Sequence, residues 1–175
     1  MTIPHSLPGI SRAFNSPLSM GDRRERGFVS WMNSNRIYFT GCDQRPEKYA
    51  EAFRGTIKRP DYTVWVPPTN TCIAVDVKCQ EPHVVFNTFT VSATEVQLLS
   101  GYQNLSHLCV WIVFTTPAAR FKTWFWIPLS EITKVGIERV ANATQARFFV
   151  IRASQCRSIA SLHALSNLIH EGYNR

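Results

Sequence analysis

The sequence predicts an α/β fold in which a mixed central β-sheet is flanked by helices. Runs of β-branched and aromatic residues, at 61–66, 71–78 and 108–115, alternate with segments whose apolar residues recur at helical spacing. A length of 175 residues is typical of one domain, and 45% hydrophobic residues are enough for a packed core. We therefore expect layers of helices packed on a sheet.

The first part of the chain is expected to form an arm, a helix and a strand. Residues 1–20 are rich in Ser, Pro and Asn without periodicity, which indicates an N-terminal arm, disordered unless it docks. Apolar residues at helical spacing predict a helix over 22–35, and a strand should follow at 36–40. Within the polar segment 43–58 we expect a short helix that begins at a proline.

Two β-rich runs in the middle of the sequence predict a hairpin. Residues 61–66 and 71–78 are separated by Pro-Pro-Thr-Asn, which is typical of a loop between strands. In an antiparallel hairpin the start of the first strand lies beside the end of the second. Asp61 and Asp76 should therefore meet, whatever the rest of the fold.

The second half of the chain is expected to alternate between helices and strands. Residues 92–95, Ser-Ala-Thr-Glu, match a capping box in which Glu95 bonds back to Ser92, and they predict a helix that runs to about residue 103. The remaining apolar runs predict strands at 108–115, 121–129 and 147–152 and a last helix over 159–169.

The chemistry of the sequence is concentrated in the hairpin. Hydrolysis of a phosphodiester requires charge neutralisation and an activated water, which carboxylates that hold Mg²⁺ supply, with a lysine to steady the water or the phosphate. Asp76 and Lys78 are two residues apart on one strand, so their side chains share a face, and Asp61 reaches the same place. The opposite face should carry Ile73, Val75 and Val77.

The residues Pro60-Asp61 and Asp76-Val77-Lys78, joined by a hairpin, resemble the PD-(D/E)xK signature of the restriction-endonuclease-like nuclease superfamily. The resemblance extends over about residues 21–132 and implies an αβββαβ core within one nuclease-like domain, 21–175. It implies Mg²⁺ or Mn²⁺ as cofactor. The Asp61 and Asp76 carboxylates, with the Val77 carbonyl oxygen, are then the expected metal ligands.

The resemblance further implies two polar residues on helices. Members of the superfamily carry a glutamate on the first helix that completes the metal site, and Glu25 is the candidate here, ahead of Glu47 and Glu51, which follow the first strand. A polar residue is also expected on the helix after the DxK strand. Gln97 is that candidate, because Glu95 is assigned to the capping box.

The net charge of the chain indicates what kind of molecule it binds. The net charge of +7 favours a polyanion such as DNA, and Arg24, Arg26, Lys58 and Arg59 are the basic residues expected to contact it. The five cysteines have no paired spacing, so we expect reduced thiols in a cytoplasmic protein, with no membrane span. Cutting two strands would require a homodimer.

These observations predict a Mg²⁺-dependent DNA endonuclease, with a structure-specific activity of the resolvase or repair kind as one form of it. The alternative is a module on the same fold that binds nucleic acid or assembles with other proteins without cutting. Other hydrolases are disfavoured, because the sequence contains no Gly-rich phosphate loop, GxSxG or HExxH motif.

Overall fold

A computed structural model describes residues 20–48, 50–67, 69–116 and 121–173 of the chain. Apart from Met20, the predicted arm lies outside these residues. Within them, the helices are α1 (Met20–Ser34), α2 (Ala93–Ser106), α3 (Leu129–Val135) and α4 (Leu162–Tyr173). The strands are β1 (Tyr38–Gly41), β2 (Tyr62–Val66), β3 (Thr71–Cys79), β4 (Thr88–Ser92), β5 (Val110–Thr115), β6 (Trp124–Pro128), β7 (Ile137–Val140), β8 (Arg147–Arg152) and β9 (Arg157–Ile159).

The described strands form two sheets. The larger sheet has six strands in the order β1-β2-β3-β5-β6-β9, and it is mixed because β3 and β5 run parallel while the other neighbours are antiparallel. The smaller sheet has three strands in the order β4-β8-β7. The predicted mixed central sheet is therefore confirmed, and the order from α1 to β5 contains the expected αβββαβ core with β4 added before α2.

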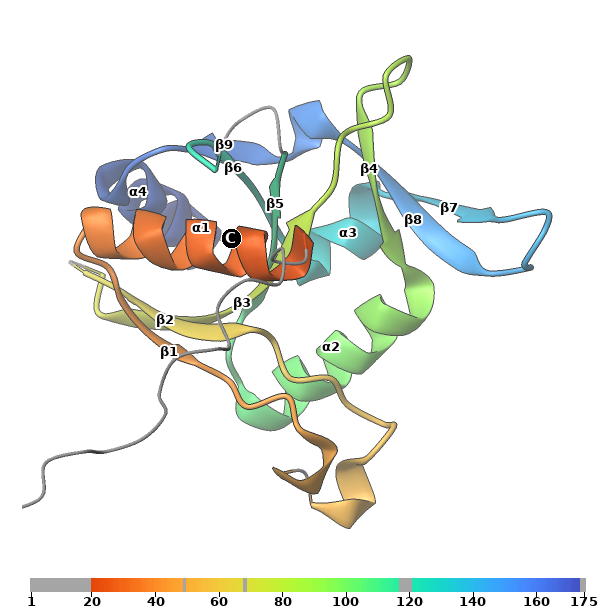
Figure 1. Cartoon of the computed structure of the whole chain (residues 1–175), viewed down its shortest axis with the longest axis horizontal. Helices are drawn as coiled ribbons and strands as arrows, with labels where there is room; N and C mark the ends of the chain where they lie inside the picture. Colours follow the sequence, from red (N-terminus) through yellow and green to blue (C-terminus); the bar gives the residue numbers. More distant parts are fainter. Residues whose placement is uncertain (1–19, 49, 68, 117–120, 174–175) are drawn as a thin grey trace, which may run out of the picture.

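The six-stranded sheet has a helix pair on each face (Figure 1). Residues of α1 and α4 pack on one face with Val75 and Val77 of β3, in a cluster rich in tryptophan. Residues of α2 and α3 pack on the other face, together with Ala74 and the smaller sheet. Alternate residues of β3 thus enter different cores, which follows from the two-residue period of a strand.

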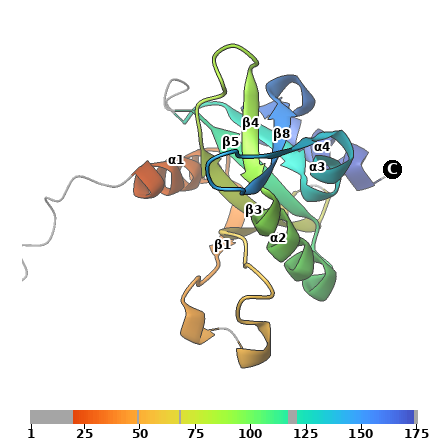
Figure 2. The same ribbon diagram turned by 90° about the vertical axis from the view of Figure 1, so that its right-hand side faces the viewer.

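An aromatic stack joins the two sheets. The ring of Phe89 in β4 lies on the ring of Phe114 in β5, with centroids 4.3 Å apart and an interplanar angle of 7°. Both side chains are fully buried. The smaller sheet is thereby packed onto the face of the larger sheet that also carries α2 (Figure 2).

The prediction of a short helix within 43–58 was wrong. The described part of this segment forms two 3-10 turns, η1 (Pro46–Lys48) and η2 (Glu51–Phe53), and it extends away from the sheet (Figures 1 and 2). No residue of η2 is buried. A helix stripe has nothing to pack against there, and most helical stability in proteins comes from such packing.

Three short strands and a helix were not predicted, namely β4, β7, β9 and α3. The four residues of β7 are all exposed, so they carry no burial pattern to detect. Ile159, expected to begin the last helix, instead pairs with Trp124 as the end of β9. The partners of β4 and β9 lie far away in the sequence, in β8 and β6, which a local pattern does not reveal. None of the described helices is long and apolar enough to cross a lipid bilayer.

We predict that Phe114→Ala lowers the free energy of unfolding by about 3–5 kcal/mol, because it removes a buried ring and leaves a cavity between the two sheets. Urea denaturation followed by circular dichroism measures the change. Phe86→Ala is the matched control, since the Phe86 side chain is 69% exposed and its removal should change stability by no more than about 0.5 kcal/mol. Equal effects of the two changes would contradict the packing described.

Candidate active site

The β2–β3 hairpin brings two aspartates together at one end. Tyr62 pairs with Val75, so the residues that come next along the ladder, Asp61 and Asp76, lie beside each other. The Asp61 Oδ2 atom accepts a hydrogen bond of 2.8 Å from the Val77 N–H, which holds Asp61 against the end of β3. The predicted meeting of Asp61 and Asp76 is confirmed.

Asp76 and Lys78 share the face of β3 that looks towards α2, as predicted. Asp76 is fully buried, in the middle of the sheet between β2 and β5. The Lys78 Nζ atom lies 2.5 Å from Asp76 Oδ2. The apolar residues between and before them enter the opposite core, as expected for Ile73, Val75 and Val77.

A third carboxylate, Glu95, completes this arrangement, and sequence reasoning assigned it a different role. The predicted capping box is wrong, because the Ser92 side chain makes no capping hydrogen bond. Glu95 Oε1 instead accepts a hydrogen bond of 2.7 Å from Lys78 Nζ. A partly buried ammonium group is a stronger partner for a carboxylate than a backbone N–H at a helix end.

Gln97 lies elsewhere on α2. It is exposed, and it is two residues from Glu95, so the two side chains leave the helix on different sides. The structure therefore does not bring Gln97 to the aspartates. One signal could have favoured Glu95: it lies in the first turn of the helix, directly after a strand, and so close to a sheet.

A second lysine enters the site from the segment before β2. The Lys58 Nζ atom donates a hydrogen bond of 2.7 Å to Asp76 Oδ1 and also pairs with Glu95 Oε1. We refer to Lys58, Asp76, Lys78 and Glu95 as the charged cluster. Sequence reasoning placed Lys58 among the DNA-contacting residues and did not foresee that it would lie in the site.

The segment that carries Lys58 is fastened on both sides. The Lys58 N–H donates to the Leu98 carbonyl oxygen of α2 at 3.1 Å. A Cβ at Gly101 would lie 3.0 Å from the Ile57 side chain, so the absence of a side chain there permits the close approach. The Gln44 Nε2 atom donates to the carbonyl oxygens of Arg59 and Pro60, at 3.0 and 2.7 Å.

Arg59, also expected to contact DNA, is directed inward. Its guanidinium donates to the Asp43 carbonyl oxygen at 3.1 Å and to the Lys48 carbonyl oxygen. These bonds close the segment between β1 and β2 onto itself. In the structure Arg59 thus braces the backbone that leads to Pro60 and Asp61.

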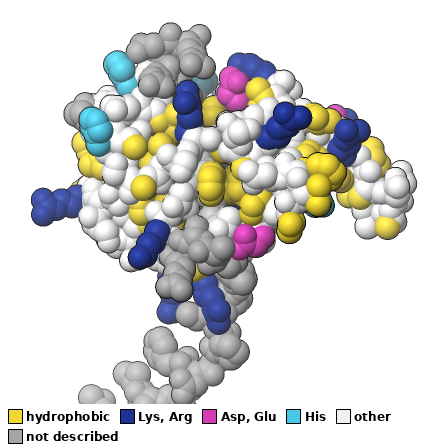
Figure 3. Space-filling view, turned by 90° about the horizontal axis from the view of Figure 1, so that it is seen from above, with side chains coloured by type: hydrophobic (Ala, Val, Ile, Leu, Met, Phe, Trp, Pro, Cys, Tyr) yellow, Lys and Arg dark blue, Asp and Glu magenta, His cyan; other side chains and the backbone are white. Residues whose placement is uncertain are grey.

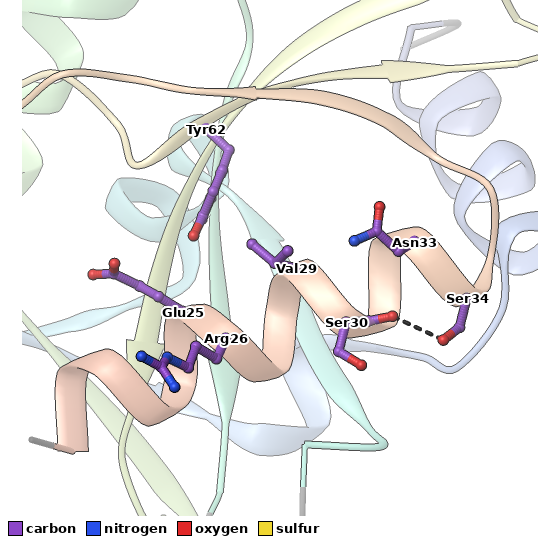
Figure 4. Close-up of a pocket in the computed structure, with 7 residues that line it drawn as sticks. All are labelled: Glu25, Arg26, Val29, Ser30, Asn33, Ser34 and Tyr62. Atoms are coloured by element: carbon purple, nitrogen blue, oxygen red, sulfur yellow. Dashed lines mark hydrogen bonds between the residues drawn. The ribbon is translucent and has the colours of Figure 1, made fainter. Parts of the chain in front are cut away.

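Glu25 lies on the α1 side of the sheet, away from the charged cluster. Its side chain is 48% exposed and pairs with Arg24 at 3.8 Å. Glu25 and Tyr62 border a shallow depression of about 520 Å³ (Figure 4), to which the exposed Arg26 also contributes. The rivals Glu47 and Glu51 are exposed on the 3-10 turns.

The pKa of Tyr62 links Glu25 electrostatically to Asp61. Burial, and then the negative charges of Glu25 and Asp61, raise the pKa of Tyr62 to about 12. Arg24 acts on the same group in the opposite direction. Glu25 is therefore close enough to influence the base of the hairpin, although it stays outside the charged cluster.

Ionisation within the site is governed by burial and by the lysines. Burial and the Asp76 carboxylate raise the pKa of Asp61 above its ordinary value, against the effect of the Val77 N–H. Burial disfavours ionised Glu95, but Lys78 and Lys58 outweigh it and lower the pKa of Glu95. Burial disfavours charged Lys58, but Asp76 and Glu95 outweigh it and raise its pKa.

The donor atoms fit a hard divalent cation by type. Asp61, Asp76 and Glu95 offer carboxylate oxygens, which Mg²⁺ and Mn²⁺ prefer. Asp76 Oδ2 is buried and accepts no hydrogen bond of acceptable geometry, so it retains capacity for a cation beyond its ion pair with Lys78. Among the described residues, no three His, Cys, Asp or Glu side chains converge as a metal site, and Lys58 and Lys78 each pair with both Asp76 and Glu95.

A mixed sheet in the αβββαβ order, with the hairpin of Asp61 and Asp76 at its centre, is the arrangement of the restriction-endonuclease-like fold. The chain has this fold. It is similar to the structure of Hjc, a Holliday junction resolvase from the archaeal hyperthermophile Archaeoglobus fulgidus, with a TM-score of 0.53 and 19% sequence identity. The match covers 81% of this chain and 93% of the resolvase. No family model matches the sequence, and no curated protein matches it significantly.

We predict that Glu95 makes stability sensitive to acid. Because the folded-state pKa of Glu95 lies below its ordinary value of 4.5, its contribution is present above that pH and is lost as pH falls through the folded value. Glu95→Gln should therefore be about 1–3 kcal/mol less stable than wild type near pH 7, with the difference shrinking as the solution is made more acidic than pH 4.5.

Urea denaturation across this pH range measures the difference. The control is Glu131→Gln, which removes a carboxylate from a surface pair with Lys134. The control should show little change with pH. A Glu95→Gln difference that stays constant with pH would contradict the ion pairing described.

Proposed function

We propose that the chain is a divalent-metal-dependent DNA endonuclease that acts on branched or otherwise distorted DNA. The observation that carries the proposal is the buried Asp76, which has Asp61 beside it across the hairpin and a lysine, Lys78, that contacts both Asp76 and Glu95. The fold is one on which phosphodiester hydrolysis is performed, and the neighbour of similar structure is described as a Holliday junction resolvase.

Each residue of the site has a proposed role. Asp61, Asp76 and the Val77 carbonyl oxygen would hold Mg²⁺ or Mn²⁺, with Glu95 as the third carboxylate in place of Glu25, since Glu95 already lies beside Asp76's two lysine partners. The bound ion would lower the pKa of a water and neutralise charge on the phosphate.

Lys78 has the role that depends least on the metal. Its ammonium lies at the end of β3, where it can donate a hydrogen bond to the attacking water or to a phosphate oxygen of DNA. Asp76 and Glu95 hold the ammonium in place by the contacts described above. A strand in the middle of a sheet is a rigid support for such a group.

DNA would be held mainly through charge. The net charge is +7, and Figure 3 shows Lys and Arg side chains spread over one face of the molecule with few acidic groups among them. On α1, Arg26 is exposed and Arg24 lies near Asp61, so both are candidates for phosphate contacts. We expect a homodimer when two strands are cut.

A second candidate function is a module on the same fold that binds nucleic acid without cutting it. It is favoured by one observation, namely that Asp76 and Glu95 are already neutralised by Lys58 and Lys78. Such a cluster can serve as a purely structural ion-pair network. The cleavage experiment below separates the two functions.

We predict that the wild-type chain nicks or cuts DNA with Mg²⁺ or Mn²⁺, and that four-way and forked DNA are better substrates than linear duplex. Lys78→Met should lower the single-turnover rate by about 10²–10³, because it removes charge stabilisation where charge develops. DNA affinity should change little, since binding draws on many basic residues.

Lys134→Met is the matched control, because Lys134 pairs with a surface glutamate on α3 and its substitution should leave the rate unchanged. Thermal melting of each variant shows that the fold is intact. A wild-type protein that cuts no DNA with either metal would overturn the nuclease proposal and favour the binding module.

We also predict that DNA affinity falls steeply with salt, with a linear dependence of log K on log salt concentration. Arg26→Ala should reduce the slope by about one, since it removes one phosphate contact. Arg147→Ala is the control, because that exposed guanidinium pairs with Glu138 on the β7–β8 hairpin. Fluorescence anisotropy of labelled DNA measures both, and an affinity that does not change with salt would sink the idea.

A further inference from the structure

The charged cluster contains one more lysine than the PD…DxK signature accounts for. Lys58 lies outside the signature, yet its ammonium lies between Asp76 and Glu95, within bonding distance of both. Lys58 thus contacts two of the carboxylates that the proposed function assigns to a divalent ion. Lys78 already neutralises charge on Asp76 and Glu95, so we expect a further role of Lys58.

We propose that Lys58 competes with the divalent metal for Asp76 and Glu95, and that a DNA phosphate relieves the competition by drawing Lys58 away. The inference rests on the proposed function, and it adds a coupling to it: metal and DNA bind cooperatively. Without DNA the lysine holds the cation position, and with DNA the position is open to the ion.

Geometry identifies Lys58, rather than Lys78, as the movable cation. Lys78 belongs to β3, a strand paired on both sides, and its side chain is 18% exposed. Lys58 lies in the segment between η2 and β2, outside any strand, and its side chain is 29% exposed. Its backbone is fixed to Leu98, but a lysine stem has enough rotatable bonds to move the ammonium with the backbone in place.

Electrostatics explains why replacement of the Lys58 ammonium by a divalent ion requires a DNA phosphate. An ammonium removed from two carboxylates into water alone loses their attraction, whereas a phosphate oxygen near the site offers a new anionic partner. The departing ammonium leaves Asp76 buried with one lysine, a state that a divalent ion would neutralise. Because the coupling is reciprocal, the factor by which DNA raises the affinity for the metal equals the factor by which the metal raises the affinity for DNA.

The test measures binding of Mn²⁺ from the electron paramagnetic resonance signal of the free ion, without DNA, for wild type, Lys58→Met and Lys134→Met. Lys58→Met should bind Mn²⁺ roughly tenfold more tightly than wild type, which is within the usual range of coupled binding events. Lys134→Met removes the same charge at a distant surface pair and should match wild type. An affinity of Lys58→Met equal to or below that of wild type would overturn the proposal.

A second measurement uses the wild-type protein and so does not depend on the folding of the variant. A short four-way DNA junction, with its own Mn²⁺ binding subtracted, should raise the Mn²⁺ affinity of wild type several-fold and that of Lys58→Met much less. No increase in wild type would also overturn the proposal. Cleavage is not the readout, so a protein that fails to cut but shows this coupling would refute the nuclease function and leave the competition standing.

Discussion

Burial of the Asp76 carboxylate on the central strand β3 is the constraint on which the site depends. A carboxylate with no exposed surface is stable in ionised form only if cations and hydrogen-bond donors replace the lost water. Lys78 supplies one ammonium from the same strand, and Lys58 supplies another from a segment outside the sheet. Glu95 then balances the two lysines from the first turn of α2.

This requirement joins three parts of the chain: the hairpin, the segment before β2 and the start of α2. Each contributes side chains to the charged cluster, in addition to the backbone bond of Lys58 to Leu98 and the close approach of Ile57 to Gly101. Removal of one member leaves the others with unbalanced charge in a partly buried site. The effects of substitutions within the charged cluster should therefore not be additive. The α1 side of the sheet behaves differently, since it is an aromatic and aliphatic core whose packing does not depend on these ions.

The same cluster bears on both candidate functions. A nuclease needs carboxylates gathered in one place with a fixed lysine, and the hairpin end provides them. A binding module needs only a stable fold with a basic surface, and two lysines satisfy the carboxylates without any metal. Displacement of Lys58 by a divalent ion would show that the cluster binds metal, and cleavage of DNA is the observation that separates the two functions.

The sequence by itself determined the elements whose partners are near in the chain. The two-residue period of β3 separated Asp76 and Lys78 from Val75 and Val77, and the hairpin placed Asp61 beside Asp76, because antiparallel neighbours joined by a short loop have one favoured register. The helices α1 and α4 were also predictable from apolar spacing, and α2 was predicted from a capping-box sequence whose capping bond does not form. This was enough for the fold class and for the heart of the site.

Only the tertiary structure decided what depends on distant pairing. Lys58 and Glu95 are 37 residues apart, and no local pattern indicates that they meet over Asp76. The capping-box match even predicted the wrong partner for Glu95. Its carboxylate bonds to the Lys78 ammonium, which the local sequence does not reveal, and not to the helix end. Strands β4 and β9 likewise form ladders with partners remote in the sequence, as the pairing of Thr88 with Arg152 shows, so their physical cause lies in packing and not in propensity.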